Sequence, residues 1–321
     1  MGLVCDDEGG GLLSSGVIGV LASSSPCRPD LFRRGLAELK AMGFELRCPL
    51  DPCAAYGSSS LTCANAQDRA GALLELLRDD EVGVIIAARG AYGSSHLLPL
   101  LDFEALASSI STPKCIVGAS DLSALLVAFC GVSDLFSKGL WAIHGPMVSG
   151  DFARMSQVEY AAQNVQMFFE LLRAEPKRLS CQCEVLRAAQ GRGPIVAGNL
   201  TMLESLLGTP WDIDYASSVL VVEDRGESPY RIHRSLYHLR LAGKLDDLAG
   251  LVFGRFSACG SPNPPSALEV LEGSVGDILG GTKYPVLSGF DFGHDGLSVP
   301  LILGQEVEIS GECFTLKGGM P

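Results

Sequence analysis

Short apolar runs alternate with longer helical patterns over the first 144 residues, and this alternation narrows the fold more than any other feature. Alternation of this kind is typical of a parallel sheet with helices on both faces, because each parallel strand needs a crossover before the next one. Ligands of such sheets bind beyond the carboxyl ends of the strands. The expected strands are residues 17–22, 82–88, 114–117 and 140–144, and the expected helices are residues 30–42, 64–78, 95–106 and 122–129.

A turn-rich stretch then divides the chain. Residues 174–193 combine charged residues with the turn signal Gly191-Arg192-Gly193-Pro194, which indicates an irregular connection. The runs at residues 306–309 and 313–317 indicate an antiparallel hairpin with Gly311 at its turn. The expected organisation is an N-terminal Rossmann-like domain with a parallel sheet (13–150), a connecting helix and linker (151–195), and a second α/β domain with mixed strands (196–321).

The composition indicates a globular protein and excludes several kinds of partner. A chain of 321 residues, 47% hydrophobic and 19% charged, can bury a core large enough for two domains. The formal net charge of −13 repels a phosphate backbone, so nucleic acid is not an expected partner. No apolar run approaches the roughly 20 residues of a membrane span, and the residues before the apolar run at 16–22 are acidic rather than basic. We expect a cytoplasmic protein that binds no membrane.

The pattern of the eleven cysteines favours neither a disulfide nor a zinc framework. Their number is odd, and Cys115, Cys130 and Cys313 lie inside apolar patterns, where a thiol acts as a small hydrophobic group. Cys181-x-Cys183 has no second pair at zinc spacing. We therefore expect reduced thiols, no metal and no cofactor.

The run Gly118-Ala119-Ser120-Asp121 lies where a strand pattern changes to a helical one. A serine at a tight strand-to-helix turn exposes its hydroxyl and directs the following N–H groups toward one point. Ser120 is therefore the candidate nucleophile. In the alternative interpretation, Ser120 or Asp121 is an ordinary helix N-cap.

A nucleophilic serine needs a base, and the base needs an acid that orients it. Of the histidines at 96, 144, 233, 238 and 294, His294 follows an apolar run in a loop, His233 and His238 lie in a helical pattern, and His96 and His144 keep a minor claim. Glu223 and Asp224 end an apolar strand, with Glu227 as another candidate acid. The order serine, acid, histidine is that of the α/β-hydrolase triad, although a solvated loop acid is the alternative.

The segment Arg89-Gly90-Ala91-Tyr92-Gly93 directly follows an expected strand. Glycine lets a backbone turn and approach a substrate closely, so the N–H groups of Gly90 and Asp121 are candidates for an oxyanion hole. The alternative, a phosphate cradle, lacks both a Walker lysine and the G-x-G-x-x-G pattern.

Several of these motifs resemble, in order, the blocks of the LD-carboxypeptidase family, serine peptidases that act on cell-wall muropeptides and include the microcin C immunity peptidases. The resemblance covers residue 16 to the end of the chain. Its blocks are Arg89-Gly90-Ala91-Tyr92-Gly93, Gly118-Ala119-Ser120-Asp121, His144-Gly145-Pro146-Met147, Gly198-Asn199-Leu200, Leu207-Gly208-Thr209-Pro210, Glu223-Asp224, Glu227-x-Pro229-Tyr230-Arg231-Ile232 and Gly289-Phe290-x-Phe292-Gly293-His294.

The resemblance implies Ser120 as nucleophile, His294 as general base and Glu223 as its orienter. It places Ser120 on the first domain and the other two residues on the second, with the active site in the cleft between them. It further implies a homodimer without a metal. The chain departs from the family pattern at Ala91, where a second glycine is usual, at Ala119, where an aromatic residue often stands, and at His233, where aspartate is usual.

The expected activity is hydrolysis of an L,D amide bond that releases D-alanine from a cytoplasmic muropeptide in cell-wall recycling. Tyr92 is expected to contact the substrate, and Arg89, Arg231 or Arg234 to bind its terminal carboxylate. One alternative is an immunity peptidase that cleaves an aminoacyl nucleotide, with Trp141 or Trp211 stacking on the adenine ring of that substrate. The other is a binding protein for a small ligand without catalysis.

Overall fold

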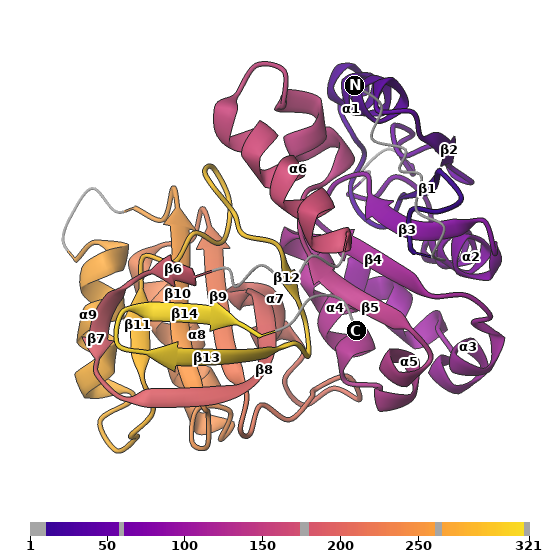
Figure 1. The fold of residues 1–321 in the computed structure, drawn as a ribbon. Coiled ribbons are helices and arrows are strands. Elements are labelled where there is room, and N and C mark those ends of the chain that lie inside the picture. Colours follow the sequence, from indigo (N-terminus) through magenta and orange to yellow (C-terminus); the bar gives the residue numbers. More distant parts are fainter. Residues whose placement is uncertain (1–10, 58–60, 174–179, 261–264, 318–321) are drawn as a thin grey trace. The chain divides into compact units, whose positions relative to one another are not determined.

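The computed structural model describes residues 11–57, 61–173, 180–260 and 265–317, and it divides into two compact units (Figure 1). The first unit is residues 1–173 and the second is residues 174–321. Each unit has a sheet of its own with helices packed against it.

The sheet of the first unit is parallel, as the alternating pattern predicts. Its strands lie side by side in the order β5-β4-β3-β1-β2, and every pairing among them is parallel. The inner strands are apolar on both faces because helices cover both, and Ile85 and Val117 are completely buried. The strands are β1 (Val17–Leu21), β2 (Glu45–Arg47), β3 (Val82–Ala87), β4 (Lys114–Gly118) and β5 (Leu140–His144).

The helices of the first unit begin at recognisable signals. The Asn65 side chain accepts a hydrogen bond from the N–H of Asp68 and so caps α2. The prediction of one helix at residues 95–106 is wrong. A 3₁₀ helix η1 (Ser94–Leu100), which contains Pro99, ends at Leu100, and Asp102 caps a separate helix that begins at Phe103. The helices are α1 (Pro29–Ala41), α2 (Ala66–Arg78), α3 (Phe103–Ser109), α4 (Ser123–Cys130), α5 (Ser133–Ser137) and α6 (Glu159–Leu172), with a 3₁₀ turn η2 (Ser120–Leu122) and a π turn η3 (Val148–Phe152).

The sheet of the second unit is mixed, with strand order β6-β14-β13-β8-β9-β10-β11-β7. Strands β8 to β11 are parallel to one another, whereas β7, β13, β14 and β6 pair antiparallel at the two edges. The hairpin of β13 and β14 turns at Gly311, as predicted. The strands in this part of the chain are β6 (Ser180–Gln182), β7 (Glu184–Arg187), β8 (Gln190–Asn199), β9 (Val219–Arg225), β10 (Gly250–Ser257), β11 (Val286–Ser288), β12 (Leu301–Ile302), β13 (Glu306–Ser310) and β14 (Cys313–Leu316).

The expectation of an irregular stretch at residues 174–193 is wrong over its described part, which contains β6, β7 and the start of β8. Gly191 and Gly193 predict a turn, but here they serve close packing within a strand. A Cβ at Gly191 would lie 2.0 Å from the carbonyl oxygen of Ala249, and one at Gly193 would lie 2.0 Å from that of Ser217. Glycine is required because other backbone crosses these two positions.

The helices of the second unit are α7 (Leu200–Ser205), α8 (Pro229–Leu241) and α9 (Ala267–Asp277). Helix α9 begins with a reciprocal capping box between Ser266 and Glu269. The guanidinium of Arg187, on β7, donates to the carbonyl oxygens of Val275, Leu279 and Thr282 and so covers the carboxyl end of the same helix. An edge strand and a helix end are thereby joined by one side chain.

The described thiols lie mostly inside the fold. Burial raises the pKa of Cys27 and Cys130 to about 11.

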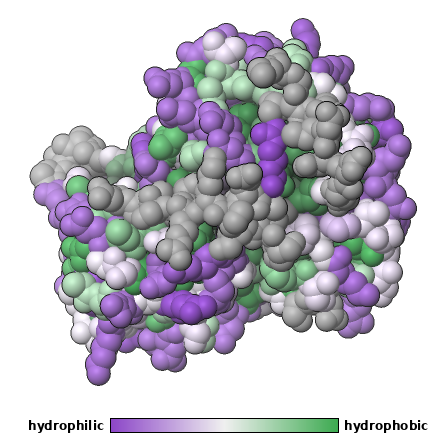
Figure 2. All heavy atoms as spheres, in the orientation of Figure 1, coloured by the Kyte–Doolittle hydropathy of each residue, from purple (hydrophilic) through white to green (hydrophobic). Residues whose placement is uncertain are grey.

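Within the described ranges, no group of three or more histidine, cysteine or acidic side chains is arranged to hold a metal ion. None of the described helices has the length and apolarity to cross a membrane, and Figure 2 shows hydrophilic residues interspersed with hydrophobic ones on one face.

Candidate active site

Ser120 lies on a strained turn between β4 and α4. Its φ of +61° is in the left-handed region, which costs a residue with a Cβ about 1–2 kcal/mol. Gly118 permits the turn, because a Cβ there would lie 2.2 Å from Leu122 Cδ2. No side chain caps η2 or α4, so the N-cap interpretation does not describe this serine. Strain of this kind is typical of a nucleophile presented at the end of a strand.

Gly90 lies directly against this turn. A Cβ at Gly90 would lie 3.0 Å from Ser120 Cβ and 3.3 Å from the backbone nitrogen of Asp121, so only glycine fits without displacing its neighbours. The N–H of Gly90 donates no hydrogen bond to any residue in the described ranges. Gly90 therefore packs beside the Ser120 turn and close to the backbone nitrogen of Asp121. The oxyanion hole predicted from the N–H groups of these two residues stays a prediction.

Ala91 occupies a position that favours glycine. Its φ is +89°, so the departure from the family pattern places a Cβ in a conformation that L residues rarely adopt. We expect Ala91→Gly to raise the free energy of unfolding by about 1 kcal/mol, measured by urea denaturation, because the substitution removes this strain. Ala105→Gly, at an exposed position of α3, is the matched control and should lower it by a similar amount. Equal destabilisation by both variants would contradict the strain at Ala91.

On the second unit, Glu223 and His294 form a hydrogen-bonded pair. Glu223 lies near the end of β9 and is fully buried, and its Oε2 is 2.6 Å from Nδ1 of His294. Gly293, with φ of +126°, makes this approach possible, since a Cβ there would lie 3.0 Å from the same oxygen. The Ser257 hydroxyl donates to the His294 carbonyl oxygen at 2.8 Å and fixes the loop. Nε2 is the ring nitrogen that the pair leaves for another partner.

The charge of Glu223 changes the basicity of this imidazole. Burial lowers the pKa of His294, but the hydrogen bond and the negative charge of Glu223 together outweigh it, so that the pKa lies above its usual value. A histidine held this way has one tautomer, with the Nδ1 proton directed at the carboxylate. Such an imidazole is suited to accept a proton at Nε2.

A second layer of polar groups holds the acid, and the sequence did not predict it. Asn199, at the end of β8, donates from Nδ2 to Glu223 Oε1 at 3.3 Å and to Asp224 Oδ1 at 2.9 Å. Asp224 in turn accepts from the N–H and hydroxyl of Thr201. The signal was available in the Gly198-Asn199-Leu200 block, but the register of β8 beside β9, which pairs Asn199 with Glu223, is not visible in the sequence.

The predicted substrate-binding residues lie on both units. Arg89 donates to the Pro26 carbonyl oxygen at 2.7 Å, and Tyr92 is 47% exposed and stacks edge-on against His96. Arg231 lies 3.5 Å from Glu227, and Arg234 lies over the ring of Tyr230. Of the minor histidine candidates, His144 is buried on β5 opposite Gly118, and His233 stacks on Tyr237 of α8.

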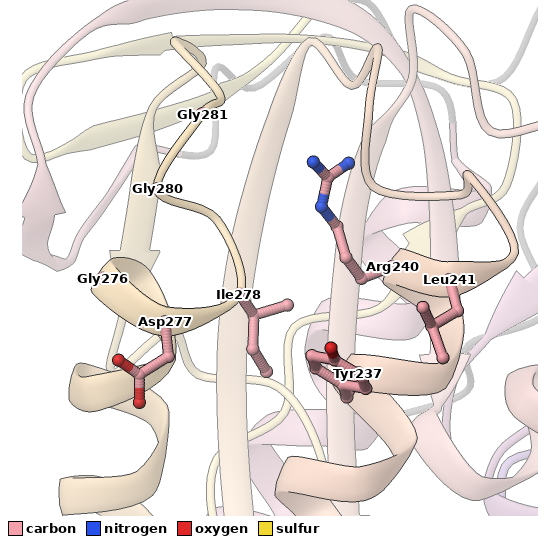
Figure 3. A pocket seen from close by; sticks show the side chains of 8 residues that line it. All are labelled: Tyr237, Arg240, Leu241, Gly276, Asp277, Ile278, Gly280 and Gly281. Atoms are coloured by element: carbon pink, nitrogen blue, oxygen red, sulfur yellow. The ribbon is translucent and has the colours of Figure 1, made fainter.

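A hollow of about 520 Å³ lies elsewhere on the second unit, between the carboxyl ends of α8 and α9 (Figure 3). Tyr237, Arg240 and Leu241 line one side of it, and residues 276–281 contribute most of the other. None of the predicted site residues lines this hollow.

Two family models match the chain over most of its length. The model described as the LD-carboxypeptidase N-terminal domain matches residues 18–137, and that of the LD-carboxypeptidase C-terminal domain matches residues 192–309. The chain belongs to the LD-carboxypeptidase family. The resemblance read from the motifs is thereby confirmed, and this member of the LD-carboxypeptidase family is a peptidase with an α/β fold built on two sheets.

Relatives of this member of the LD-carboxypeptidase family cover nearly the whole chain. The probable murein peptide carboxypeptidase of Bacillus subtilis is 30% identical over 295 residues, which cover 91% of this chain and 88% of the relative. The microcin C7 self-immunity protein MccF of Escherichia coli is 26% identical over 91% of this chain and 90% of its own. The crystal structure of muramoyltetrapeptide carboxypeptidase from Oxalobacter formigenes matches with a TM-score of 0.79 and 28% identity, over 94% of this chain and 98% of that one.

Proposed function

We propose that this protein is a serine-type LD-carboxypeptidase that releases a C-terminal D-amino acid, D-alanine, from a muropeptide during cytoplasmic cell-wall recycling. The observation that carries the proposal is the 2.6 Å contact between the buried Glu223 carboxylate and His294 Nδ1. A buried carboxylate that orients one imidazole is the arrangement that activates a nucleophile. The strained Ser120, with Gly90 packed against it, supplies the nucleophile. Relatives named as murein peptide carboxypeptidases support the substrate class.

In the proposed reaction, Ser120 Oγ attacks the carbonyl carbon of the scissile amide while Nε2 of His294 takes the hydroxyl proton. The N–H groups of Gly90 and Asp121 bind the oxyanion of the tetrahedral intermediate. The intermediate collapses when Nε2 returns the proton to the leaving nitrogen, which breaks the C–N bond and releases the D-amino acid. Water then repeats the sequence on the acyl-enzyme and regenerates the serine. Glu223 stabilises the imidazolium at each stage.

The leaving group carries a free carboxylate, which needs a cationic partner. Arg89, Arg231 and Arg234 are the proposed candidates because a guanidinium binds a carboxylate through two parallel hydrogen bonds. Arg89 retains donors beyond its bond to Pro26, and the side chain of Arg231 is 51% exposed. Tyr92 is proposed to contact the same end of the substrate.

The experiment that tests this function compares two substrates and one covalent probe. We expect release of D-alanine from an L-Ala-D-Glu-diaminopimelate-D-Ala tetrapeptide, and modification of Ser120 by a fluorophosphonate in the wild type but not in His294→Ala. Turnover of an aminoacyl sulfamoyl adenylate alone would replace the proposed substrate by an aminoacyl nucleotide. Absence of both turnover and labelling, with the fold intact, would favour a non-catalytic binding protein.

The structure offers little for stacking a nucleobase at the residues considered for it. Trp141 lies within β5 and is 8% exposed, as expected of a side chain that packs in the core. Trp211 is half-buried in the segment after α7. The muropeptide remains the proposed substrate.

A further inference from the structure

We propose that Asp121 and Arg69 are positioning residues whose side chains hold Gly93 by its N–H and its carbonyl oxygen and thereby fix the Gly90 N–H beside Ser120. The inference rests on the proposed function, because it concerns the oxyanion hole of that reaction. It assigns a task to two buried charged residues that the proposed mechanism does not otherwise use.

The Asp121 carboxylate holds the loop from the side of the nucleophile turn. It is 3% exposed and accepts three hydrogen bonds, from Gly93 N–H at 3.1 Å, from Ser94 N–H at 2.8 Å and from the Ser24 hydroxyl at 2.7 Å. The Ser94 hydroxyl also donates to the backbone carbonyl of Asp121. The residue that follows the nucleophile therefore supplies both an oxyanion N–H and the anchor of the loop that carries the other one.

Arg69 holds the same loop at the other backbone polar group of Gly93, its carbonyl oxygen. It is 1% exposed and donates from Nη1 to the Gly93 carbonyl oxygen at 2.7 Å. The same guanidinium donates to the Ser23 carbonyl oxygen, and Nε donates to that of Ala64 at 3.1 Å. Because Ser23 precedes Ser24, Arg69 and Asp121 bind neighbouring residues of one segment as well as the two ends of one glycine.

The loop needs such anchors because its backbone is strained and partly exposed. Ala91 and Gly93 both have positive φ, at +89° and +109°, and Ala91 and Tyr92 are exposed. On its amino-terminal side the loop is tied at Ala88, whose N–H donates to Leu21 and whose carbonyl oxygen accepts from Ser149. Between Ala88 and Gly93 the described loop is held at these two ends and by the Arg89 side chain, which donates to the Pro26 carbonyl oxygen at 2.7 Å. The hold at Gly93 therefore helps to determine where the Gly90 N–H points. A shift of a few tenths of an ångström there weakens an oxyanion hydrogen bond.

The test uses Asp121→Asn and Ser24→Ala, with Asp102→Asn as the matched control. Asparagine can accept only one of the two loop N–H bonds and turns an NH₂ group toward the other, so we expect kcat to fall roughly 10- to 100-fold with KM unchanged. Ser24→Ala removes one donor to the carboxylate and should lower kcat about threefold. Asp102 caps α3 by accepting the Ala105 N–H, a task that asparagine performs equally well, so its variant should keep wild-type kcat.

A second readout separates positioning from general damage to the fold. A tripeptide boronic acid forms a tetrahedral adduct whose oxygen occupies the oxyanion hole, so its inhibition constant should rise in Asp121→Asn by the same factor as kcat falls. In a Ser120→Ala background, the affinity for the intact tetrapeptide should be the same with and without the Asp121→Asn substitution. Arg69→Lys, which keeps the charge but fewer donors, should again lower kcat and boronate affinity together.

The outcomes distinguish this inference from the function on which it rests. If the wild type releases no D-alanine and the boronic acid does not inhibit it, the proposed function fails. If the wild type is active and Asp121→Asn keeps its kcat, or loses substrate affinity and boronate affinity equally, the positioning role is overturned and the function stands.

Discussion

Replacing Ser120 by alanine is expected to lower kcat for D-alanine release by roughly 10⁶-fold, the loss typical of a serine hydrolase without its nucleophile. The reason is that no acyl-enzyme can form, so water must attack the amide directly with help only from binding and the oxyanion N–H groups. Substrate affinity should remain, because the hydroxyl makes little contact with the peptide before attack. The measurement is single-turnover release of D-alanine, with peptide affinity determined by calorimetry.

The matched control for this variant is Ser108→Ala, which removes an exposed hydroxyl on α3 that donates to Glu104. It should leave kcat unchanged. Activity in Ser120→Ala within tenfold of the wild type would exclude Ser120 as the nucleophile. Alanine keeps the Cβ of serine, so the backbone strain at position 120 should be the same in the wild type and in Ser120→Ala. A change in stability would then not account for the loss of activity.

Glu223→Gln is expected to reduce kcat about 10⁴-fold, even though glutamine has nearly the same shape. The glutamine amide can direct an N–H toward Nδ1 of His294, which moves the ring proton to Nε2 and removes the base. The amide also leaves the imidazolium without the negative charge 2.6 Å away that stabilises it. The measurement is kcat for tetrapeptide hydrolysis at saturating substrate.

The pH profile of kcat/KM should change with it. In the wild type, Glu223 holds the pKa of His294 above its usual value, so activity falls as the pH drops through that raised pKa and the base becomes protonated. Without the carboxylate the pKa falls, and the acidic limb of the residual activity should move to lower pH. An acidic limb that moves to higher pH, or does not move, would contradict this assignment of the base.

Glu227→Gln is the control that separates the two carboxylates considered as the acid. Glu227 lies 3.5 Å from Arg231 on the surface of the second unit and is 23% exposed. An exposed ion pair contributes at most about 1 kcal/mol, so this variant should keep kcat within about fivefold. A loss as large as that of Glu223→Gln would transfer the role to Glu227.

Much of the fold was predictable because burial on both faces of a parallel sheet leaves each inner strand as a continuous apolar run. Strand β5 was predicted with its observed bounds, and β3 and β4 within one residue at one end. The polar edge strands were not predicted, since β2 and β7 are half-exposed and carry charged residues that read as loop. Strand β8 was missed at its start because Gly191 and Gly193 signal a turn when seen alone, and only the crossing backbone of Ala249 and Ser217 explains them.

In the candidate site too, residues marked by a local sequence pattern were predicted, whereas contacts between residues far apart in the sequence were not. Ser120 and Gly90 follow strand ends and Glu223 lies near the end of β9, and the end of an apolar strand is a local pattern. The loop anchors were not predicted, because Arg69 lies in an amphipathic helix where an arginine usually faces solvent. Its partners Ser23 and Gly93 are 46 and 24 residues away, and Ser24 is 97 residues from Asp121. Contacts at such separations appear only once the chain has folded.

Thiols buried in this fold are poor competitors for electrophiles. Only a thiolate is a strong nucleophile, and with pKa values of about 11 for Cys27 and Cys130, well under ~1 in 1,000 of these groups is ionised near neutral pH. Alkylating agents and mild oxidants should therefore react only slowly with these two thiols. In a chain with eleven cysteines, we therefore expect Cys27 and Cys130 to stay unmodified under conditions that alkylate an exposed thiol of ordinary pKa.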